Sequence, residues 1–476
     1  MTPPTDPLPS ARYRPLSLLV GLAFFMEQLD STIIAPAIPD IARQYGVTPL
    51  SLNLTLTIYL LCSVAFIPTS GFLAARWGTR PVFRGALLLF VLSSLLCAAA
   101  PNLATLAAAR ALQGVAAALM VPVGRMAIVH STPRGQLVLA LAWMITPAML
   151  GPLFGPLLGG LITTAWSWHW IFLINLPIGL AGWWYAGRVM PQILQPMASR
   201  FDGLAWTLLA ALLACLIAGL EWLRHALQAP LAGGWGSALA ASMLLLAAAY
   251  AWRSRSAAAP LLAFSLLRER SFNTSFWAGA LVRVGYGALP FLLPLMLQLG
   301  LGFSAVQSGL ALLASGAVAF VTKTQTAGIL RRWGFRRVLV VNGLLCALGL
   351  GLCAAFQAHW GLAAIAVAVS VAGFFRSIQF NALAAIAYAD LPASQVAAAT
   401  TLNTMGQQLA VMLGISLSAL AVDVSSRLAG RAQPATGDFA LAFGLVTVAA
   451  LAALPFYLRL RHDAGSELSG HRPIAP

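Results

Sequence analysis

The sequence predicts an all-α, polytopic membrane protein, and three observations lead to that prediction. Hydrophobic residues make up 60% of the 476 residues and charged residues only 8%, whereas soluble domains carry about 25% charged residues. The apolar residues gather in runs long enough to cross roughly 30 Å of hydrocarbon, which takes about 20 residues. Arginines lie mostly between these runs. Most of the surface of such a chain must therefore face lipid.

Fourteen apolar runs qualify as membrane spans, in two sets of six with a pair between them. The expected spans are residues 15–38, 50–74, 81–100, 104–127, 137–163 and 169–187, then 203–223 and 235–252, and finally 272–298, 306–328, 337–357, 360–384, 397–420 and 438–458. The predicted domains follow from this order: a cytoplasmic tail (1–14), an N-terminal six-helix bundle (15–187), two inserted helices with linkers (188–258), a C-terminal six-helix bundle (259–461) and a second cytoplasmic tail (462–476). The first span also serves as the insertion signal, because the proline-rich start has no apolar run that a cleavable signal peptide needs.

The arginines between the spans predict the orientation. Cytoplasmic segments of membrane proteins carry an excess of Lys and Arg. If both termini are cytoplasmic, the cytoplasmic segments hold Arg12, Arg14, Arg76, Arg80, Arg84, Arg134, Arg188, Arg200, Arg253, Arg255, Arg268, Arg270, Arg331, Arg332, Arg336, Arg337, Arg459, Arg461 and Arg472. The opposite segments then hold only Arg43, Arg224, Arg427 and Arg431. An odd number of spans would destroy this bias, so we expect fourteen.

Several functional classes are excluded by what the sequence contains. The net charge of +16 arises from arginines dispersed between spans, which disfavours nucleic-acid binding. The five cysteines lie inside apolar runs and have no metal-ligand spacing. No P-loop, HExxH or GxSxG sequence occurs. We therefore expect a protein that is not an enzyme, with no metal and no cofactor.

A weak internal repeat relates the two sets of six spans. GFLAARWGTRPVF follows the second span of the first set, and AGILRRWGFRRVL follows the second span of the last set. Both place Trp-Gly and arginines in a short turn. Two six-helix halves of this kind are typical of secondary transporters, whose substrate site lies near the membrane midplane between the repeats.

Five stretches of the sequence resemble motifs of one family. GFLAARWGTR (71–80) resembles the loop motif of the major facilitator superfamily, with Gly71, Arg76, Gly78 and Arg80 at the motif positions. RALQG (110–114) is similar to its fourth-helix motif, and GPLFGPLLGG (151–160) to its antiporter motif. LDSTI (29–33) and WIFLINLPIG (170–179) resemble the fourteen-span drug:proton antiporters, with the MdtD/HsrA-like subgroup as the nearest match.

The resemblance implies the major facilitator fold, proton-driven export, alternating access and a functional monomer. One position departs from the family pattern, because Ala75 stands where the loop motif has an acid that holds one conformation closed. Asp202 is a candidate source of a substitute charge.

Two acids in the first span are the candidate proton-coupling residues. Glu27 and Asp30 lie three residues apart and so share one helix face. Charges inside a span are costly, and a low-dielectric site disfavours the ionised form, so such groups can exchange protons near neutral pH. Arg110, which stays protonated, is expected to hold Asp30 charged until substrate or a conformational change separates them. The alternative for each is a structural ion pair.

Glycines and prolines alternate in the fifth span. Gly151, Pro152, Gly155, Pro156, Gly159 and Gly160 recur at four-residue spacing. Glycines on one face permit close helix contact, and prolines bend a helix. A tight, bent fifth helix is expected to seal the centre against proton leakage, although a plain packing bend gives the same pattern.

Three of the last spans have a cation within or near them and contain no acid. Arg283, Lys323 and Arg376 lie within or near spans. Unpaired cations near a midplane cavity favour an anionic group on the substrate; alternatively they pair with Glu27 and Asp30, and Lys323 reaches the membrane surface. Gln113, Arg283, Arg376, Phe25 and Phe291 are the candidate substrate-binding residues.

The sequence therefore predicts a proton-coupled exporter of drug-like or amphipathic small molecules in the bacterial inner membrane. Its expected partners are the substrate, protons and the lipid bilayer, and its energy source is the proton gradient. The alternative is an exporter of a small organic anion or anionic chelate. A membrane sensor has little support because no soluble signalling domain is present.

Overall fold

The computed structural model describes residues 13–194, 201–226, 235–257, 260–392, 395–431, 433–461, 463–469 and 471. Within these ranges the chain is helical and contains no strand. The ends of the two predicted tails, including Arg12 and Arg472, and the linker residue Arg200 lie outside the described residues.

The first half begins with α1 (Tyr13–Ile33), which continues through the short helices η1 (Ala35–Ala37) and α2 (Ile38–Tyr45). After η2 (Pro49–Leu52) come α3 (Asn53–Trp77), α4 (Thr79–Ala98) and α5 (Leu103–Ser131). The short η3 (Arg134–Gln136) then leads into α6 (Leu137–Ala165).

The sixth predicted span is built from two helices, α7 (Trp170–Leu173) and α8 (Asn175–Val189), both of which lie along α4. Pro177 has no N–H to donate to the carbonyl four residues before it, and the helix is interrupted at that point. Thirteen helices in the described part of the chain are therefore long and apolar enough to cross a membrane by themselves. The one predicted crossing not among these thirteen is the sixth, which is this interrupted pair.

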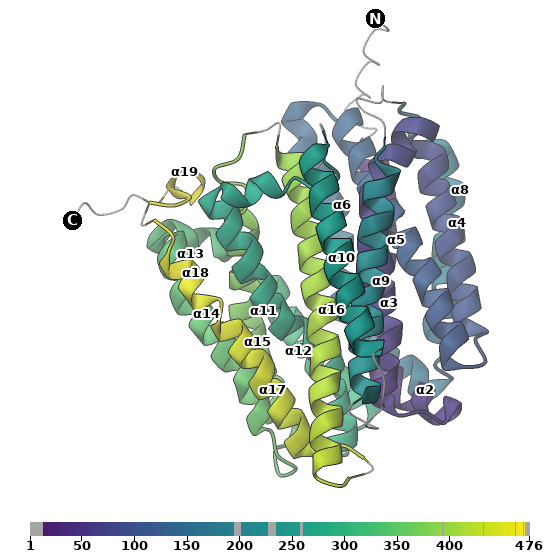
Figure 1. The fold of residues 1–476 in the computed structure, drawn as a ribbon, viewed down its shortest axis with the longest axis vertical. Coiled ribbons are helices and arrows are strands. Elements are labelled where there is room, and N and C mark those ends of the chain that lie inside the picture. The colour runs from purple at the N-terminus through teal and green to yellow at the C-terminus, as the bar shows by residue number, and fades with distance from the viewer. Residues whose placement is uncertain are drawn as a thin grey trace, which may run out of the picture.

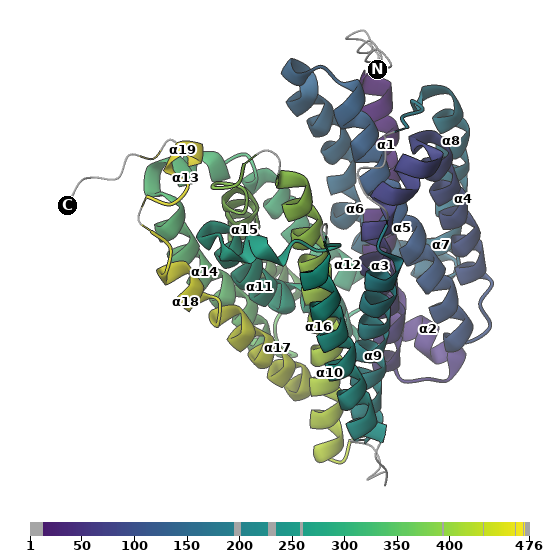
Figure 2. The ribbon, with the colours of Figure 1, turned by 45° about the horizontal axis from the view of Figure 1, so that its top comes forward.

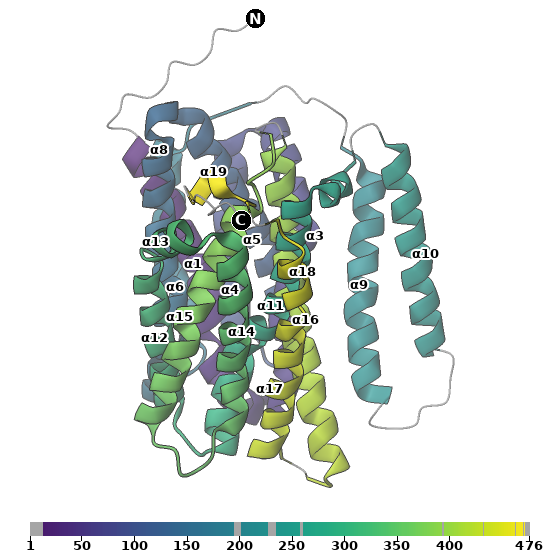
Figure 3. The same ribbon diagram turned by 90° about the vertical axis from the view of Figure 1, so that its left-hand side faces the viewer.

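The two inserted helices are α9 (Gly203–Ala226) and α10 (Trp235–Ser256). They form a hairpin at one edge of the molecule (Figure 3). α9 packs on α3 and α16 (Val396–Leu428), whereas α10 packs mainly on α9. The Trp206 indole N–H donates to the carbonyl of Ala65 at 2.9 Å, which attaches the hairpin to the first half.

The second half begins with η4 (Phe264–Arg268) and α11 (Arg270–Leu295), which ends in the π-helical turn η5 (Met296–Gly300). It continues with α12 (Ala305–Thr322), α13 (Thr326–Trp333), α14 (Phe335–Leu352), η6 (Cys353–Ala355) and α15 (Leu362–Ile386). After α16 come α17 (Thr436–Leu451), α18 (Leu454–Leu458) and α19 (Ser466–Ser469). The predicted span 306–328 is divided at Lys323–Gln325, between α12 and α13.

The helix contacts repeat between the halves. α1 packs on α6 as α11 packs on α16, α3 on α5 as α12 on α15, and α4 on α8 as α14 on α17. The same repetition builds the interface, because α6 packs on α12 and α16 packs on α3. The two halves stand side by side in Figure 1. This arrangement agrees with the two six-helix bundles predicted from sequence.

The repeated turns have the same backbone. Gly78 has φ 90° and ψ 159°, and Gly334 has φ 72° and ψ 162°. This region of φ and ψ is essentially restricted to glycine. Each turn is covered by the segment that follows the sixth crossing of its own half: Thr79 Oγ1 donates to the Pro191 carbonyl at 2.6 Å, and the His471 ring contacts the Arg331 carbonyl at 3.0 Å.

The two bundles diverge toward the end of the molecule at which α1 begins and α19 lies (Figure 2). At the opposite end the halves touch backbone to backbone. A Cβ at Gly160 would lie 2.5 Å from the Ala305 carbonyl oxygen, and one at Gly309 would lie 2.5 Å from that of Pro156. The contact between α6 and α12 therefore requires glycine on both helices.

Candidate functional site

An ion pair between α1 and α5 lies at the centre of the first half. Arg110 Nη1 donates to Asp30 Oδ2, and both side chains are completely buried. A buried pair needs further hydrogen bonds to offset the loss of hydration. Asp30 Oδ1 accepts from Gln113 Nε2 at 2.9 Å and from Asn175 Nδ2 at 3.0 Å. The carboxylate is thus fixed by donors on α5 and α8.

The fourth-helix motif explains how Arg110 is held. Its Nη1 also donates to Gln113 Oε1 at 2.6 Å, and its Nε donates to the Thr55 carbonyl at 3.4 Å. Gly114 allows α3 to approach, because a Cβ there would lie 2.2 Å from the Tyr59 carbonyl oxygen. This approach puts the Tyr59 ring 4.4 Å from the guanidinium carbon. The motif therefore supplies a cation, a hydrogen-bonding amide and a close helix contact.

Sequence reasoning missed Asn175, Ser94 and Tyr59. Ser94 accepts from Gln113 Nε2 at 2.8 Å, and Asn175 lies just after the break between α7 and α8. A single amide within the apolar run WIFLINLPIG was the available signal for Asn175. Nothing in the sequence placed Ser94 or Tyr59 beside Asp30.

Glu27 occupies a different environment from Asp30. It is 8% exposed, and its Oε2 has no hydrogen-bond partner among the described residues. It lines a cavity of about 320 Å³ between the halves, whereas Asp30 does not. The two acids of the first span therefore differ: the Glu27 side chain faces the cavity, and the Asp30 side chain is enclosed in the first half.

The interface holds two adjoining cavities. The first, which includes Glu27, Arg110 and Arg283, also includes Gln407 and Gln408 of α16. The second has a volume of about 450 Å³ and is lined by α1, α6, α11, α12 and α15. Gln28, Thr32 and Pro290 line both. A small molecule in this space would touch both halves at once.

The cations of the second half face these cavities without a carboxylate partner among the described residues. Arg283 lies 4.7 Å from the centre of the Phe380 ring, and Arg376 lies 5.8 Å from that of Tyr286. Lys323 lines the second cavity, where its Nζ lies 3.2 Å from Met149 Sδ. The alternative pairing with Glu27 or Asp30 is not present among the described residues, because Asp30 pairs with Arg110 and Glu27 Oε2 has no partner.

The remaining predicted contact residues are distributed unevenly. Phe291 is fully buried and lines the first cavity. Phe25 packs half-buried against the hydrophobic core and does not line either cavity, whereas its neighbour Phe24 lines the second. Gln113 is enclosed with Asp30 and also lies outside the cavity walls.

The glycines of α6 allow this helix to pack closely against α1. A Cβ would lie 2.7 Å from the Leu29 nitrogen at Gly151, 2.2 Å from Thr32 Oγ1 at Gly155 and 2.0 Å from the Ile33 carbonyl oxygen at Gly159. Pro152 and Pro156 lie on the cavity wall. One face of α6 therefore packs closely on α1, the helix that carries both acids. Gly160 of α6 contacts α12 instead.

The loop motif docks on the chain after α8. Arg80 Nε donates to the Met190 carbonyl at 2.6 Å, and a Cβ at Gly78 would collide with the Gln192 side chain. Arg76 is exposed, and Gly71 has open space around it. Asp202 forms an ion pair with Arg253 at 2.9 Å. The charge of Asp202 is therefore paired at the inserted hairpin, and nothing in the described part of the chain connects it to Ala75.

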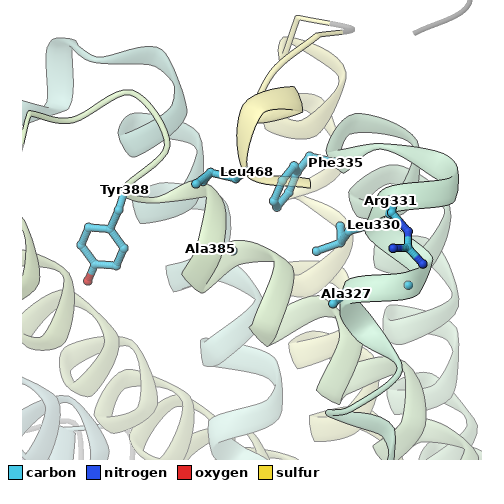
Figure 4. A pocket seen from close by; sticks show the side chains of 8 residues that line it. Ala327, Leu330, Arg331, Phe335, Ala385, Tyr388 and Leu468 are labelled. Carbon is cyan, nitrogen blue, oxygen red and sulfur yellow. The ribbon is translucent and has the colours of Figure 1, made fainter. Parts of the chain in front are cut away.

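A further cavity of about 570 Å³ lies away from the interface, at the end of the second half (Figure 4). It is lined by Leu330, Arg331, Phe335, Tyr388 and Leu468, with Ala327, Gly328 and Ala385. No acid lines it, and it does not touch the buried ion pair. The cavities between the halves, which include Glu27 and the cations of the second half, are the stronger candidate site.

Two repeated helical bundles with cavities between them, formed by helices long enough to cross a membrane, are the architecture of a multi-pass membrane transporter. The sequence pattern of the Major Facilitator Superfamily matches residues 20–415 and again residues 275–476. The chain belongs to the major facilitator superfamily.

Its relatives are bacterial proteins provisionally named multidrug resistance protein MdtD. The chain is 33% identical to that of Klebsiella pneumoniae over 94% of this chain and 95% of the relative. It is 35% identical to that of Cronobacter sakazakii over 92% of each chain, and 34% identical to that of Pectobacterium atrosepticum over 92% of this chain and 93% of the relative. The predicted resemblance to MdtD-type transporters is confirmed.

Among solved structures, the chain resembles that of the POT family transporter PepTSo. The TM-score is 0.69 at 11% identity, and the match covers 96% of this chain and all of the other. At this identity the likeness concerns the fold alone. It supports the major facilitator fold predicted from sequence.

Proposed function

We propose that the protein exports drug-like or amphipathic small molecules from the bacterial cytoplasm in exchange for protons, by alternating access across the inner membrane. The single observation that supports this most is the pair of unlike acids on α1. Glu27 lines the cavity between the halves, and Asp30 is enclosed with Arg110 three residues further on. The provisional name of the MdtD relatives supports the drug-like substrate class.

In this proposal Glu27 exchanges protons with the cavity. Its unpartnered Oε2 is the atom available to a proton or to a donor group of the substrate. Asp30 stays ionised while Arg110, Gln113 and Asn175 donate to it. A conformational change that moves α1 away from α5 and α8 would remove these donors, and a proton would then replace them. Proton uptake is in this way tied to the position of α1.

The conformational change in this proposal is a rocking of the two halves about the α6–α12 and α3–α16 contacts. In the described conformation the halves meet at the end remote from α19, through Gly160 and Gly309. Gln298 Nε2 of η5 also donates to the Pro36 carbonyl of the first half at 3.2 Å at that end. The opposite end, where Lys323 lies, is where the cavity would admit a substrate from the cytoplasm.

The proposal also names what transport requires. The proton gradient supplies the energy, and no bound cofactor or metal takes part. A single chain in the lipid bilayer is the functional unit, and nucleic acid is not a partner.

The test combines resistance with proton movement. Expression in a bacterial strain that lacks its own pumps should raise resistance to ethidium, and ethidium should cause proton movement in proteoliposomes that contain the protein. Glu27→Gln and Asp30→Asn should abolish both effects. Resistance of wild-type level in either variant would refute the role of that acid in proton coupling.

A second function is favoured by the cations of the second half. Arg283 and Arg376 face the cavities over aromatic rings and have no carboxylate partner in the described chain. An organic anion or anionic chelate would supply the missing charge. Transport of radiolabelled citrate into inverted vesicles, compared between wild type and Arg376→Gln, distinguishes this substrate class from ethidium. Citrate transport that is absent, or unaffected by the substitution, would reject it.

A further inference from the structure

Four buried polar atoms without a hydrogen-bond partner in the described chain belong to residues that line one cavity. They are Glu27 Oε2, Tyr59 Oη, Arg110 Nη2 and Gln408 Oε1. Buried polar groups are rarely left unpartnered, because their desolvation is then not compensated. Two of these atoms are donors, one is a carboxylate oxygen and one is an amide oxygen. Of the four residues, only Tyr59 and Gln408 have no role in the mechanism proposed above, and of these two only Tyr59 touches the buried ion pair.

Tyr59 lines the cavity beside Arg110, the cationic member of the buried ion pair. Its ring covers the Arg110 guanidinium at 4.4 Å, and its backbone is pressed onto α5 at Gly114. Its phenol group and Glu27 belong to the lining of the same cavity, and neither the Tyr59 hydroxyl nor Glu27 Oε2 has a hydrogen-bond partner among the described residues. The ring is 3% exposed, so this position is fixed by packing on several sides.

We propose that Tyr59 is a positioning residue that couples the cavity-facing Glu27 to the Asp30–Arg110 pair. Its hydroxyl donates a hydrogen bond to Glu27 when that carboxyl is ionised, directly after a side-chain rotation or through one water. Its ring stays over Arg110 in either case. The inference rests on the proposed proton coupling and adds the residue that connects the two acids.

The other charged and titratable groups around Glu27 come from a small number of elements. α6 and α7 contribute none, and those of α8 are confined to its last turns, at Tyr185 and Arg188. Groups that face Glu27 from α1, α5 and α11 are Asp30, Arg110, Arg125 and Arg283. The three cations stay protonated. Unlike these groups, the Tyr59 hydroxyl is a neutral donor, so its removal can affect Glu27 without changing a charge.

The second half provides a matched control. Tyr286 also lies beneath an arginine, Arg376, at 5.8 Å from its ring. Its hydroxyl, however, donates to the Cys346 carbonyl at 2.7 Å rather than to a carboxyl group. Tyr59→Phe and Tyr286→Phe each remove one buried hydroxyl and keep the ring. Only the first should affect Glu27.

The experiment is an infrared titration of the purified full-length protein in lipid nanodiscs. The carboxylic C=O band that disappears in Glu27→Gln reports protonated Glu27. In Tyr59→Phe the band should persist to a pH higher by about one unit, as expected for loss of a hydrogen bond to a charged group. Tyr286→Phe should leave its midpoint within a few tenths of a unit of wild type. An equal midpoint in the two variants would overturn the proposal, as would the absence of any Glu27 band.

A second measurement needs no substituted tyrosine. In the wild-type protein a tyrosine C–O band should change over the same pH interval as the Glu27 band, and Glu27→Gln should abolish that change; an unchanged tyrosine band would contradict the coupling. Neither titration involves transport. A linked titration without proton-driven transport would refute the proposed function alone, and transport without the link would refute only the role of Tyr59.

Discussion

In the first half of the molecule a buried arginine meets a carboxylate, whereas in the second half two arginines meet aromatic rings. Arg110 is completely buried and is paired with Asp30. Arg283 and Arg376 are half-buried and lie over Phe380 and Tyr286. A cation over an aromatic ring is stabilised less than one in a buried ion pair but stays available to a ligand. The arginine of the first half is therefore neutralised within the protein. In our proposal, the two arginines of the second half are neutralised by an anionic substrate.

The largest expected effect comes from breaking the compensated pair. Asp30→Asn leaves Arg110 charged and unpaired in the core, which should destabilise the protein by about 3–5 kcal/mol and abolish transport. Thermal unfolding and ethidium transport measure the two effects. Asp423→Asn is the control, because its partner Arg427 is 41% exposed and such pairs contribute about 0.2–1 kcal/mol. Comparable losses in the two variants would contradict the contrast between buried and surface pairs.

A smaller effect is expected from the uncompensated arginines. Arg376→Gln should weaken binding of an anionic substrate by roughly 10–100-fold, the value of one charged hydrogen bond, and should affect ethidium transport far less. Citrate transport in vesicles is the measurement. Arg337→Gln is the control, since Arg337 also lies over a ring, that of Trp333 at 4.7 Å, but is exposed outside the cavities. A loss in ethidium transport alone would reverse the proposed assignment.

The packing of the acid-bearing helix provides the next test. Gly159→Ala forces a methyl group to within 2.0 Å of the Ile33 carbonyl oxygen, and overpacking of this kind costs about 1–3 kcal/mol. The loop-motif glycine is the matched control, because Gly71 has nothing within 4 Å and Gly71→Ala should stabilise α3 by up to about 1 kcal/mol. Unfolding curves of both variants show whether each substitution raises or lowers the free energy of unfolding. Equal destabilisation would contradict the close contact of α6 with the end of α1.

The smallest effect is expected at the inserted hairpin. A hydrogen bond from the Ala205 backbone N–H and the Arg253 guanidinium hold the pKa of Asp202 below its ordinary value. Because this folded-state pKa is depressed, the stabilisation is present above the ordinary aspartate pKa of about 4. It is lost as the pH falls through the lower folded value. Asp202→Asn should remove that pH dependence and change stability by less than about 1 kcal/mol. An unchanged slope of stability against pH in the acid range would refute the assignment.

Much of the architecture followed from the sequence, with two differences at particular residues. Hydropathy placed the sixth crossing at 169–187 but did not reveal that it breaks at Ile174, where the missing N–H of Pro177 interrupts the helix. Hydropathy also extended one span through Lys323–Gln325, where the structure ends α12 and begins α13. Both breaks depend on local backbone hydrogen bonds, which the average hydropathy of a window does not record.

The candidate site was predictable only in part. Asp30, Glu27 and Arg110 stand out because charged residues inside an apolar span are costly, and the sequence shows each of them. Asp30 is enclosed and Glu27 faces the cavity because of how α1 is rotated about its axis within the bundle. The sequence does not specify this rotation. Ser94 and Tyr59 carry no charge, so nothing in their local sequence distinguishes them from ordinary packing residues. Asn175 is marked only as a single amide within an apolar run.

The sequence by itself determined the membrane-spanning class, the two repeated halves and the intramembrane charges, because these follow from the energy of transferring side chains into lipid. Only the tertiary structure decided which charges meet. Arg110 lies 80 residues from Asp30 in the chain, and the contact of α1 with α5 and α8 brings the side chains of Arg110, Gln113 and Asn175 to one carboxylate. Among the described residues, Arg283 and Arg376 have no acid partner, because the helices packed around them present aromatic rings. These pairings depend on helix rotation and packing, which local composition does not specify.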